Sequence, residues 1–358
     1  MVYLIYSLIF FIFAWVFTNQ RNPKYSLYGF CFFSIVLFWG LSYINALDTP
    51  GYIEKFNYDI QTIPGYIDRQ YEIGYTLLAM LFKTVYPQYW FFQLVVFGIE
   101  CFLIIKGLQY YFDDKQLIFI IPLLFFLYPT NLFAFRQGIA TSLFIYALHY
   151  INAESFKKSL LFFVFIGTAF LFHQSAIILI IVYPLRYAKK IVSNNWIIFT
   201  ILLLGDLLWA TGLSILSQFD FLLPLFYGDI LDMGEKYIRI YEGANQTGTF
   251  GLAKVLEVNI TVLLYTLYCE QDKENEAFRF NLLIFLIIGL YIGGFVAHRL
   301  NYYWTILYYV CFVRSVMSIP AFKESKSLSY FLIAIYMFWF YIIKSDYMHE
   351  EYLLLFNF

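Results

Sequence analysis

Charged residues are scarce in this chain. Lys, Arg, Asp and Glu make up 13% of its 358 residues, whereas about 25% is typical of soluble domains. The two signs nearly cancel, giving a net charge of −1, and no long basic tract occurs. The low charge argues against a water-soluble domain, and without a basic tract nucleic-acid binding has no electrostatic basis.

Cysteine and histidine are also scarce, with four residues of each. All four cysteines, Cys31, Cys101, Cys269 and Cys311, lie within or at the ends of apolar segments. Structural disulfides are therefore not expected. The spacing of cysteine and histidine matches no zinc or iron motif, so we expect no metal held by cysteine. We also predict no cofactor.

The chain also lacks an internal repeat and shows no two similar halves, which argues against a secondary transporter. Its first apolar run, residues 2–17, has neither a basic segment before it nor a small-residue cleavage site. The basic residues follow the run instead, at 21–24. We therefore expect this run to be retained as a first helix.

Apolar residues are abundant, at 62% of the chain, and 23% of all residues are aromatic. A helix that crosses a bilayer needs ~20 apolar residues. The pattern predicts an all-α polytopic membrane protein, a single domain over 1–358 with about 11 to 13 transmembrane helices, some of them broken or re-entrant. Residues 73–86 form a shorter apolar segment, for which we predict a half-helix or an interfacial helix. The longer apolar runs are 2–17, 25–43, 89–105, 116–130, 133–150, 158–173, 174–186, 195–211, 251–269, 280–297, 300–318 and 328–343.

The distribution of lysine and arginine predicts the orientation, because basic loops favour the cytoplasmic side. Most basic residues fall in loops that can share one side, which leaves both termini and two long loops, 43–72 and 211–250, outside. These loops combine aromatic residues with carboxylates and amides. Such a composition suits carbohydrate, since sugar C–H faces stack on rings and hydroxyls pair with polar groups. The alternative is that both loops are solvated connectors.

Arg136 lies in one of the most apolar parts of the chain. A permanently charged side chain at mid-membrane costs at least ~3 kcal/mol, so it is usually retained for function. We expect Arg136 one to two turns inside its helix, facing the outer half of the bilayer, where it would bind an anion. The alternative is structural: the guanidinium extends to the lipid headgroups or pairs with a carboxylate to hold helices together.

Two further polar points follow along the chain, at His173 and at the pair His298 and Arg299. We expect His173 at an outer turn near water, where its pKa near neutrality suits a base or a donor; the alternative is a hydrogen-bonded structural histidine. His298 and Arg299 are predicted at the junction of helices 280–297 and 300–318. Arginine suits phosphate, but an interfacial arginine in an aromatic belt is the alternative.

Four motifs in order carry a resemblance to a known family. They are YEIGY at 71–75, FRQGIATS at 135–142, LFHQSAIIL at 171–179 and HRLNYYW at 298–304. In this order the chain resembles the EpsG-like and Wzy-type bacterial polysaccharide polymerases, and the resemblance covers most of its length. Ile73 stands where the family commonly has a proline after the glutamate.

The resemblance implies a GT-C-like, metal-independent glycosyltransferase of the bacterial cytoplasmic membrane, active at its outer face. Such an enzyme transfers a glycan from undecaprenyl diphosphate to a sugar hydroxyl of an acceptor repeat unit, and a chain-length regulator protein is an implied partner. Arg136 and Arg299 would bind the donor diphosphate, and His173 would deprotonate the acceptor or assist phosphate binding. The predicted substrate contacts are His298, Tyr302, Tyr303, Asp48, Glu72, Arg239 and Glu242.

Three other functions fit a membrane protein with such a site. A flippase for lipid-linked oligosaccharides would spread its cations through the depth of a central cavity. A membrane O-acyltransferase would need a histidine-centred acyl site with access to a cytoplasmic acyl donor. An O-antigen ligase differs from a polymerase only in its acceptor. The length of the cell-surface glycan separates a polymerase from the first two.

Overall fold

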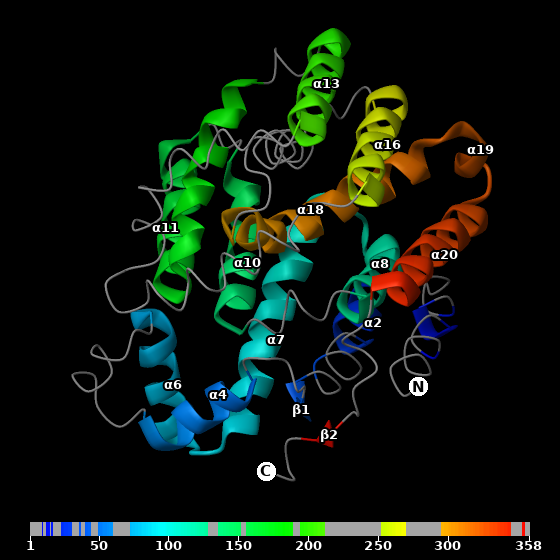
Figure 1. Cartoon of the computed structure of the whole chain (residues 1–358). Helices are drawn as coiled ribbons and strands as arrows, with labels where there is room; N and C mark the ends of the chain where they lie inside the picture. Colours follow the sequence, from blue (N-terminus) through cyan, green and yellow to red (C-terminus); the bar gives the residue numbers. More distant parts are fainter. Residues whose placement is uncertain are drawn as a thin grey trace. The chain divides into compact units, whose positions relative to one another are not determined.

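The computed structural model describes residues 9, 12–14, 16, 23–30, 36, 40–43, 49–59, 72–127, 135–151, 155–188, 194–211, 252–269, 295–344 and 353–354. Nearly all of them are helical, which confirms the predicted helical class (Figure 1). Among these residues the only strands are two of two residues each, paired antiparallel with Ser42 opposite Leu354. The number of membrane crossings stays a prediction.

The helices vary from one turn to 24 residues. Besides the strands β1 (Ser42–Tyr43) and β2 (Leu353–Leu354), the elements are α2 (Pro23–Phe30), α4 (Thr49–Glu54), the π-helix η2 (Lys55–Asp59), α6 (Ile73–Val85), α7 (Tyr89–Leu108), α8 (Asp114–Leu127), α10 (Phe135–Ala147), the 3₁₀-helix η3 (Leu148–Tyr150), α11 (Phe156–Phe172), the 3₁₀-helix η4 (Gln174–Ala188), α13 (Asn195–Thr211), α16 (Leu252–Tyr268), α18 (Phe295–Ser318), α19 (Pro320–Lys323) and α20 (Lys326–Lys344).

Most predicted runs coincide with helices to within a few residues, as α13 and α16 illustrate. The short segment predicted at 73–86 is the 13-residue helix α6. One boundary is wrong: α18 continues unbroken through the expected junction near residue 299. Because arginine, leucine and asparagine at 299–301 all tolerate a helix, nothing in the local sequence ends it there.

Within the described part of the chain, α7 alone is long and apolar enough to cross a membrane, with 20 residues and a mean hydropathy of 2.0. Several shorter apolar helices accompany it, at Ile73–Val85, Gln174–Pro184, Asn195–Leu207, Val258–Tyr268 and Ser327–Tyr336. They fall below the ~20 residues that a straight span requires. Together with the composition, these helices indicate a membrane-associated protein.

The chain divides into two compact units, which are described separately. In the first, α10 packs against both α7 and α11, and it lies between them in Figure 1. Phe92 of α7 meets Phe135 of α10 with ring centroids 5.2 Å apart, while Gly107 lies against Ile145 at the other ends of the same helices. The first contact joins the starts of the two helices and the second joins their ends, so α7 and α10 run parallel.

Helices α10 and α11 are joined by a short connection and pack side by side. Tyr146, near the end of α10, contacts Phe165 with ring centroids 5.0 Å apart, and Tyr150 stacks on the same ring. The helices are therefore antiparallel. Arg136 precedes Tyr146 by about as many residues as His173 follows Phe165, which places both at the same end of this helix pair.

Gly107 allows α7 to approach α10 closely. A Cβ atom at this position would lie 2.7 Å from the carbonyl oxygen of Ile145, a backbone atom that cannot move aside alone. Small residues at such contacts let helix backbones meet, as in other membrane helices. The contact therefore sets how closely α10, the helix that carries Arg136, packs against α7.

We expect Gly107→Ala to destabilise the first unit by about 1 to 3 kcal/mol, because the added methyl overpacks the α7–α10 contact. Gly167→Ala is the matched control, since no atom lies within 4 Å of a Cβ there and alanine favours a helix by ~1 kcal/mol over glycine. Thermal unfolding in detergent measures both. A Gly107→Ala midpoint equal to that of Gly167→Ala would contradict the close contact.

In the second unit, polar side chains link neighbouring helices. Asn259 of α16 donates to Asp206 of α13 over 2.8 Å, and Thr261 of α16 donates to the hydroxyl of Tyr308 on α18 over 3.0 Å. Such interhelical hydrogen bonds typically stabilise membrane helix bundles by ~0.6 kcal/mol each. They explain why α16 packs against both α13 and α18.

Candidate functional site

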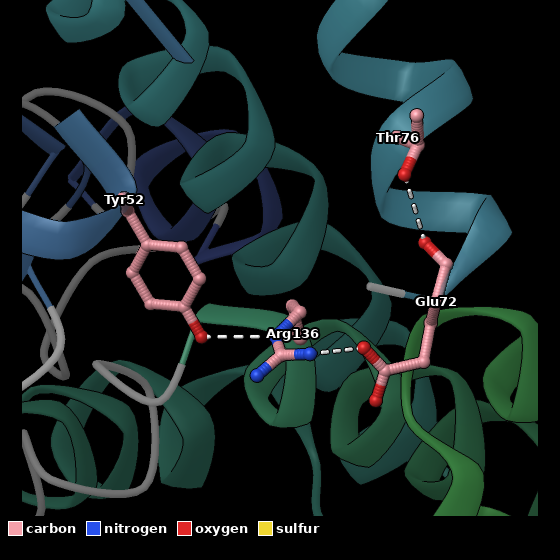
Figure 2. Close-up of polar contacts among 4 residues, drawn as sticks. All are labelled: Tyr52, Glu72, Thr76 and Arg136. Atoms are coloured by element: carbon pink, nitrogen blue, oxygen red, sulfur yellow. Dashed lines mark hydrogen bonds and ion pairs between the residues drawn. The ribbon is translucent and has the colours of Figure 1, made fainter. Parts of the chain in front are cut away.

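Arg136 lies in the first turn of α10 and contacts two side chains that are distant in sequence. Its Nη1 forms an ion pair with Glu72 Oε2, across 64 residues of chain. Its Nε donates a 3.1 Å hydrogen bond to the hydroxyl of Tyr52. Figure 2 shows the guanidinium between the phenol and the carboxylate. We call these three residues the Arg136 cluster.

Glu72 stands at the position that caps the N-terminus of α6, but its side chain makes no capping bond. The carboxylate turns to Arg136 instead, while the carbonyl oxygen of Glu72 accepts from the backbone N and the Oγ1 of Thr76, each over 3.3 Å (Figure 2). The backbone of Glu72 is therefore held by the first turn of α6. A carboxylate near a helix N-terminus is also stabilised by the helix dipole.

Tyr52 is fixed by aromatic rings that pack beneath the Arg136 cluster. Its ring centroid lies 5.5 Å from Tyr75 and 5.8 Å from Phe135, and Phe135 in turn contacts Phe92. Each of these side chains is buried, and tilted aromatic pairs add roughly 0.5 to 1.5 kcal/mol beyond their burial. The phenol that holds Arg136 therefore has little freedom to move.

Lys83 connects the far end of α6 to the segment that carries Tyr52. Its Nζ donates to the carbonyl oxygens of Phe56 and Asn57, over 2.7 and 2.9 Å. The same ammonium lies 5.8 Å from the centroid of the Phe56 ring. Lys83 therefore ties α6 to η2.

The Arg136 cluster is partly open to its surroundings. The side chain of Arg136 is 23% exposed and that of Glu72 is 11% exposed. Breaking a buried ion pair by removing one partner costs about 3 to 5 kcal/mol, because it leaves the other charge uncompensated. A ligand that displaces Glu72 from Arg136 must therefore supply an anion of its own, and phosphate is the anion that a guanidinium matches best apart from carboxylate.

His173 ends α11, and its backbone N donates to the carbonyl oxygen of Ala169 over 2.9 Å. The expectation of a histidine near water is wrong, since His173 is only 8% exposed. Close to it in sequence, α11 approaches α6: a Cβ at Gly74 would lie 2.7 Å from the carbonyl oxygen of Leu171. His173 and Glu72 flank this contact, each two positions from it.

Arg136 is the second residue of α10 as the structure describes it, Phe135–Ala147. Residues 128–134 lie outside the described part, so the depth of one to two turns stays a prediction. At this position the guanidinium reaches Glu72, which directly precedes α6. The structural alternative from the sequence, a pairing with a carboxylate, is therefore present, and it joins two predicted site residues.

Among the remaining predicted site residues, Tyr303 alone has a described side chain. Tyr303 belongs to the second unit, where it is fully buried and its hydroxyl lies 3.0 Å from Ser175 Oγ. The backbone at 298, 299 and 302 is part of α18, but the side chains of His298, Arg299 and Tyr302 lie outside the described part, as do Asp48, Arg239 and Glu242 entirely.

Tyr52 is the member of the cluster that sequence reasoning missed. It lies in the long segment 43–72, which was interpreted as an external loop rich in aromatic residues. The structure forms a short helix there, α4, followed directly by η2. The available signal was the apolar and aromatic spacing of Tyr52, Ile53 and Phe56, which one face of a helix can share.

Apolar helices that carry a partly exposed ion pair indicate the class: a helical, membrane-associated protein with a charged site. Residues 25–357, nearly the whole chain, match the model of the EpsG family. The chain therefore belongs to the EpsG family, a family of Wzy-like polysaccharide polymerases. This match confirms the resemblance inferred from the four motifs. No curated protein and no solved structure matches the chain.

Proposed function

We propose that the protein is a membrane-embedded glycosyltransferase that polymerises lipid-linked oligosaccharide repeat units. The donor is a glycan on undecaprenyl diphosphate, and the acceptor is a sugar hydroxyl of the next repeat unit. The observation that carries this proposal is the Arg136 cluster in a chain of the EpsG family. Two of its three members stand in the motifs that support the family resemblance.

The chemistry of this transfer needs positive charge where the diphosphate departs. Electrostatic stabilisation of a developing anion is often the largest catalytic contribution in such reactions. Arg136, held by Tyr52 and partly exposed, supplies a fixed guanidinium of suitable shape. In the proposal Arg299 supplies a second one, and His173 either deprotonates the acceptor or contacts phosphate.

The rest of the proposal concerns the setting of the enzyme. The chain crosses the bacterial cytoplasmic membrane several times, with the site toward the outer face, where flipped lipid-linked units arrive. The support is the apolar composition and the distribution of basic loops. Segments 43–72 and 211–250 then contact the glycan through Asp48, Arg239 and Glu242. His298, Tyr302 and Tyr303 of α18 add further substrate contacts, and a chain-length regulator would bind the same assembly.

Loss of the gene in its native host tests the function. A polymerase mutant is expected to retain a single lipid-linked repeat unit at the outer face and to lose the ladder of longer chains on a gel. A flippase mutant would lack external units altogether, whereas an acyltransferase mutant would keep its chain length. Either of the latter patterns, reversed by the intact gene, would contradict the proposed polymerase.

A further inference from the structure

Glu72 and Tyr52 both contact the guanidinium of Arg136 in the structure. The two contacts differ in kind: Tyr52 is a neutral phenol that orients Nε, while Glu72 carries a negative charge that neutralises the guanidinium. As long as Glu72 is paired with it, Arg136 offers little net attraction to another anion. The same pairing keeps the Glu72 carboxylate occupied as an acceptor.

We propose that Glu72 is the general base of the transfer and that its ion pair with Arg136 is the resting state of a switch that the donor diphosphate opens. This inference rests on the proposed function. The diphosphate replaces the carboxylate on Nη1 of Arg136, and the released carboxylate then faces the acceptor hydroxyl. Glu72 thereby becomes a catalytic residue rather than a substrate contact alone.

The exchange keeps the charges balanced throughout. Glu72 contacts Arg136 through Nη1, and phosphate, like carboxylate, accepts hydrogen bonds from a guanidinium. One anion therefore replaces the other on Arg136. Tyr52 holds Nε in both states, because its ring is packed against Tyr75 and Phe135 and does not depend on Glu72. The guanidinium therefore stays in position when its anion changes.

The released carboxylate stays close to the reacting groups. The backbone of Glu72 is held by Thr76 within the first turn of α6, and α6 is held against α11 at Gly74 and Leu171. Only the side-chain torsions of Glu72 need to change. His173, on the other side of the same contact, is then left to bind phosphate instead of serving as the base.

In the transfer step Glu72 takes the proton of the acceptor hydroxyl, and the acceptor oxygen forms a bond to the anomeric carbon of the donor glycan. The bond from that carbon to the diphosphate oxygen breaks, and its electron pair leaves with the undecaprenyl diphosphate, which Arg136 holds. After the lipid product dissociates, Glu72 releases its proton to solvent and pairs with Arg136 again.

The switch makes an unusual prediction for Glu72→Gln. Glutamine keeps the shape of the side chain but no longer competes as an anion, so undecaprenyl diphosphate should bind the purified protein roughly 5-fold or more tightly than wild type. The rate of transfer should nevertheless fall by about 10²- to 10⁴-fold, the usual contribution of a general base. Binding is measured in lipid nanodiscs with undecaprenyl diphosphate, and transfer by the glycan ladder in complemented cells.

Glu54→Gln is the matched control, because Glu54 is an exposed carboxylate on α4 in the same unit. Its diphosphate affinity and glycan ladder should equal those of wild type. Glu72→Asp is the second variant, with a carboxylate one methylene shorter. Its looser pairing should also raise diphosphate affinity, and its remaining carboxylate should restore part of the ladder, which keeps the test valid if Glu72→Gln fails to fold.

Two results would overturn the switch. Weaker or unchanged diphosphate binding in both Glu72 variants would mean that the carboxylate supports Arg136 instead of competing for it. A full ladder in Glu72→Gln would mean that another group is the base. Failure of the proposed function looks different, since wild-type protein itself would not bind undecaprenyl diphosphate and the gene deletion would leave the ladder intact.

Discussion

Arg136→Ala is expected to abolish long-chain glycan while the protein remains in the membrane. Removing one group that stabilises a departing anion lowers the rate by ~10²- to 10³-fold in other enzymes, and a polymer amplifies this loss because each added unit repeats the step. Arg136→Lys should retain part of the ladder, since lysine keeps the charge but replaces the fork with a point charge. A gel of cell-surface glycan from complemented cells measures both.

The structure adds a control that separates chemistry from stability. Arg136→Ala leaves the Glu72 carboxylate, 11% exposed, without the ion pair seen here, which can destabilise the fold by several kcal/mol. The double variant Arg136→Ala with Glu72→Gln removes this charge. We expect it to recover thermal stability in detergent but not the glycan ladder. Wild-type chain lengths in either variant would remove Arg136 from the mechanism.

His173→Ala and Arg299→Ala should each leave single-repeat products, and the double variant should be little worse than either one. Groups that act as a unit in one site are strongly non-additive, because the loss of one already disables the step. Donor binding should weaken in both single variants if both contact phosphate. Binding is measured with undecaprenyl diphosphate in nanodiscs, and the rate by the growth of the glycan ladder.

Additive losses would instead place the two residues in separate steps. Normal donor affinity without Arg299, together with a full ladder, would mean that the diphosphate is bound elsewhere. His149→Ala is a suitable comparison for His173→Ala, because His149 lies in η3, at the opposite end of the α10–α11 pair. The same imidazole is removed in both variants, so a difference between them shows that the position of His173 matters.

The candidate site shows where sequence reasoning succeeds. A guanidinium in an apolar segment is costly, so the composition alone drew attention to Arg136. The motif at 71–75 likewise predicted Glu72 as a site residue. Their pairing could not be predicted, because 64 residues separate them and contact between the starts of α10 and α6 depends on how α7 and α11 pack.

Helix ends and burial were predicted less well for a similar reason. His173 has polar neighbours in sequence, Gln174 and Ser175, which favoured a position near water. Its burial depends on how segments distant in sequence pack around it, which no local pattern encodes. Tyr52 was missed because a helix of six residues gives too short a periodic signal to stand out within a polar segment.

The bonds from Lys83 to the carbonyl oxygens of Phe56 and Asn57 have a mechanical consequence. Glu72 directly precedes α6 and Lys83 lies near its end. Tyr52 belongs to the segment to which Lys83 is hydrogen-bonded. The two residues that contact Arg136 therefore belong to segments that Lys83 also connects, and α6 lies between the two points of connection. This connection keeps the distance between α6 and the α4–η2 segment constant when a bulky lipid headgroup enters. Substrate exchange at Arg136 can then proceed by rotation of side chains, without movement of the backbone.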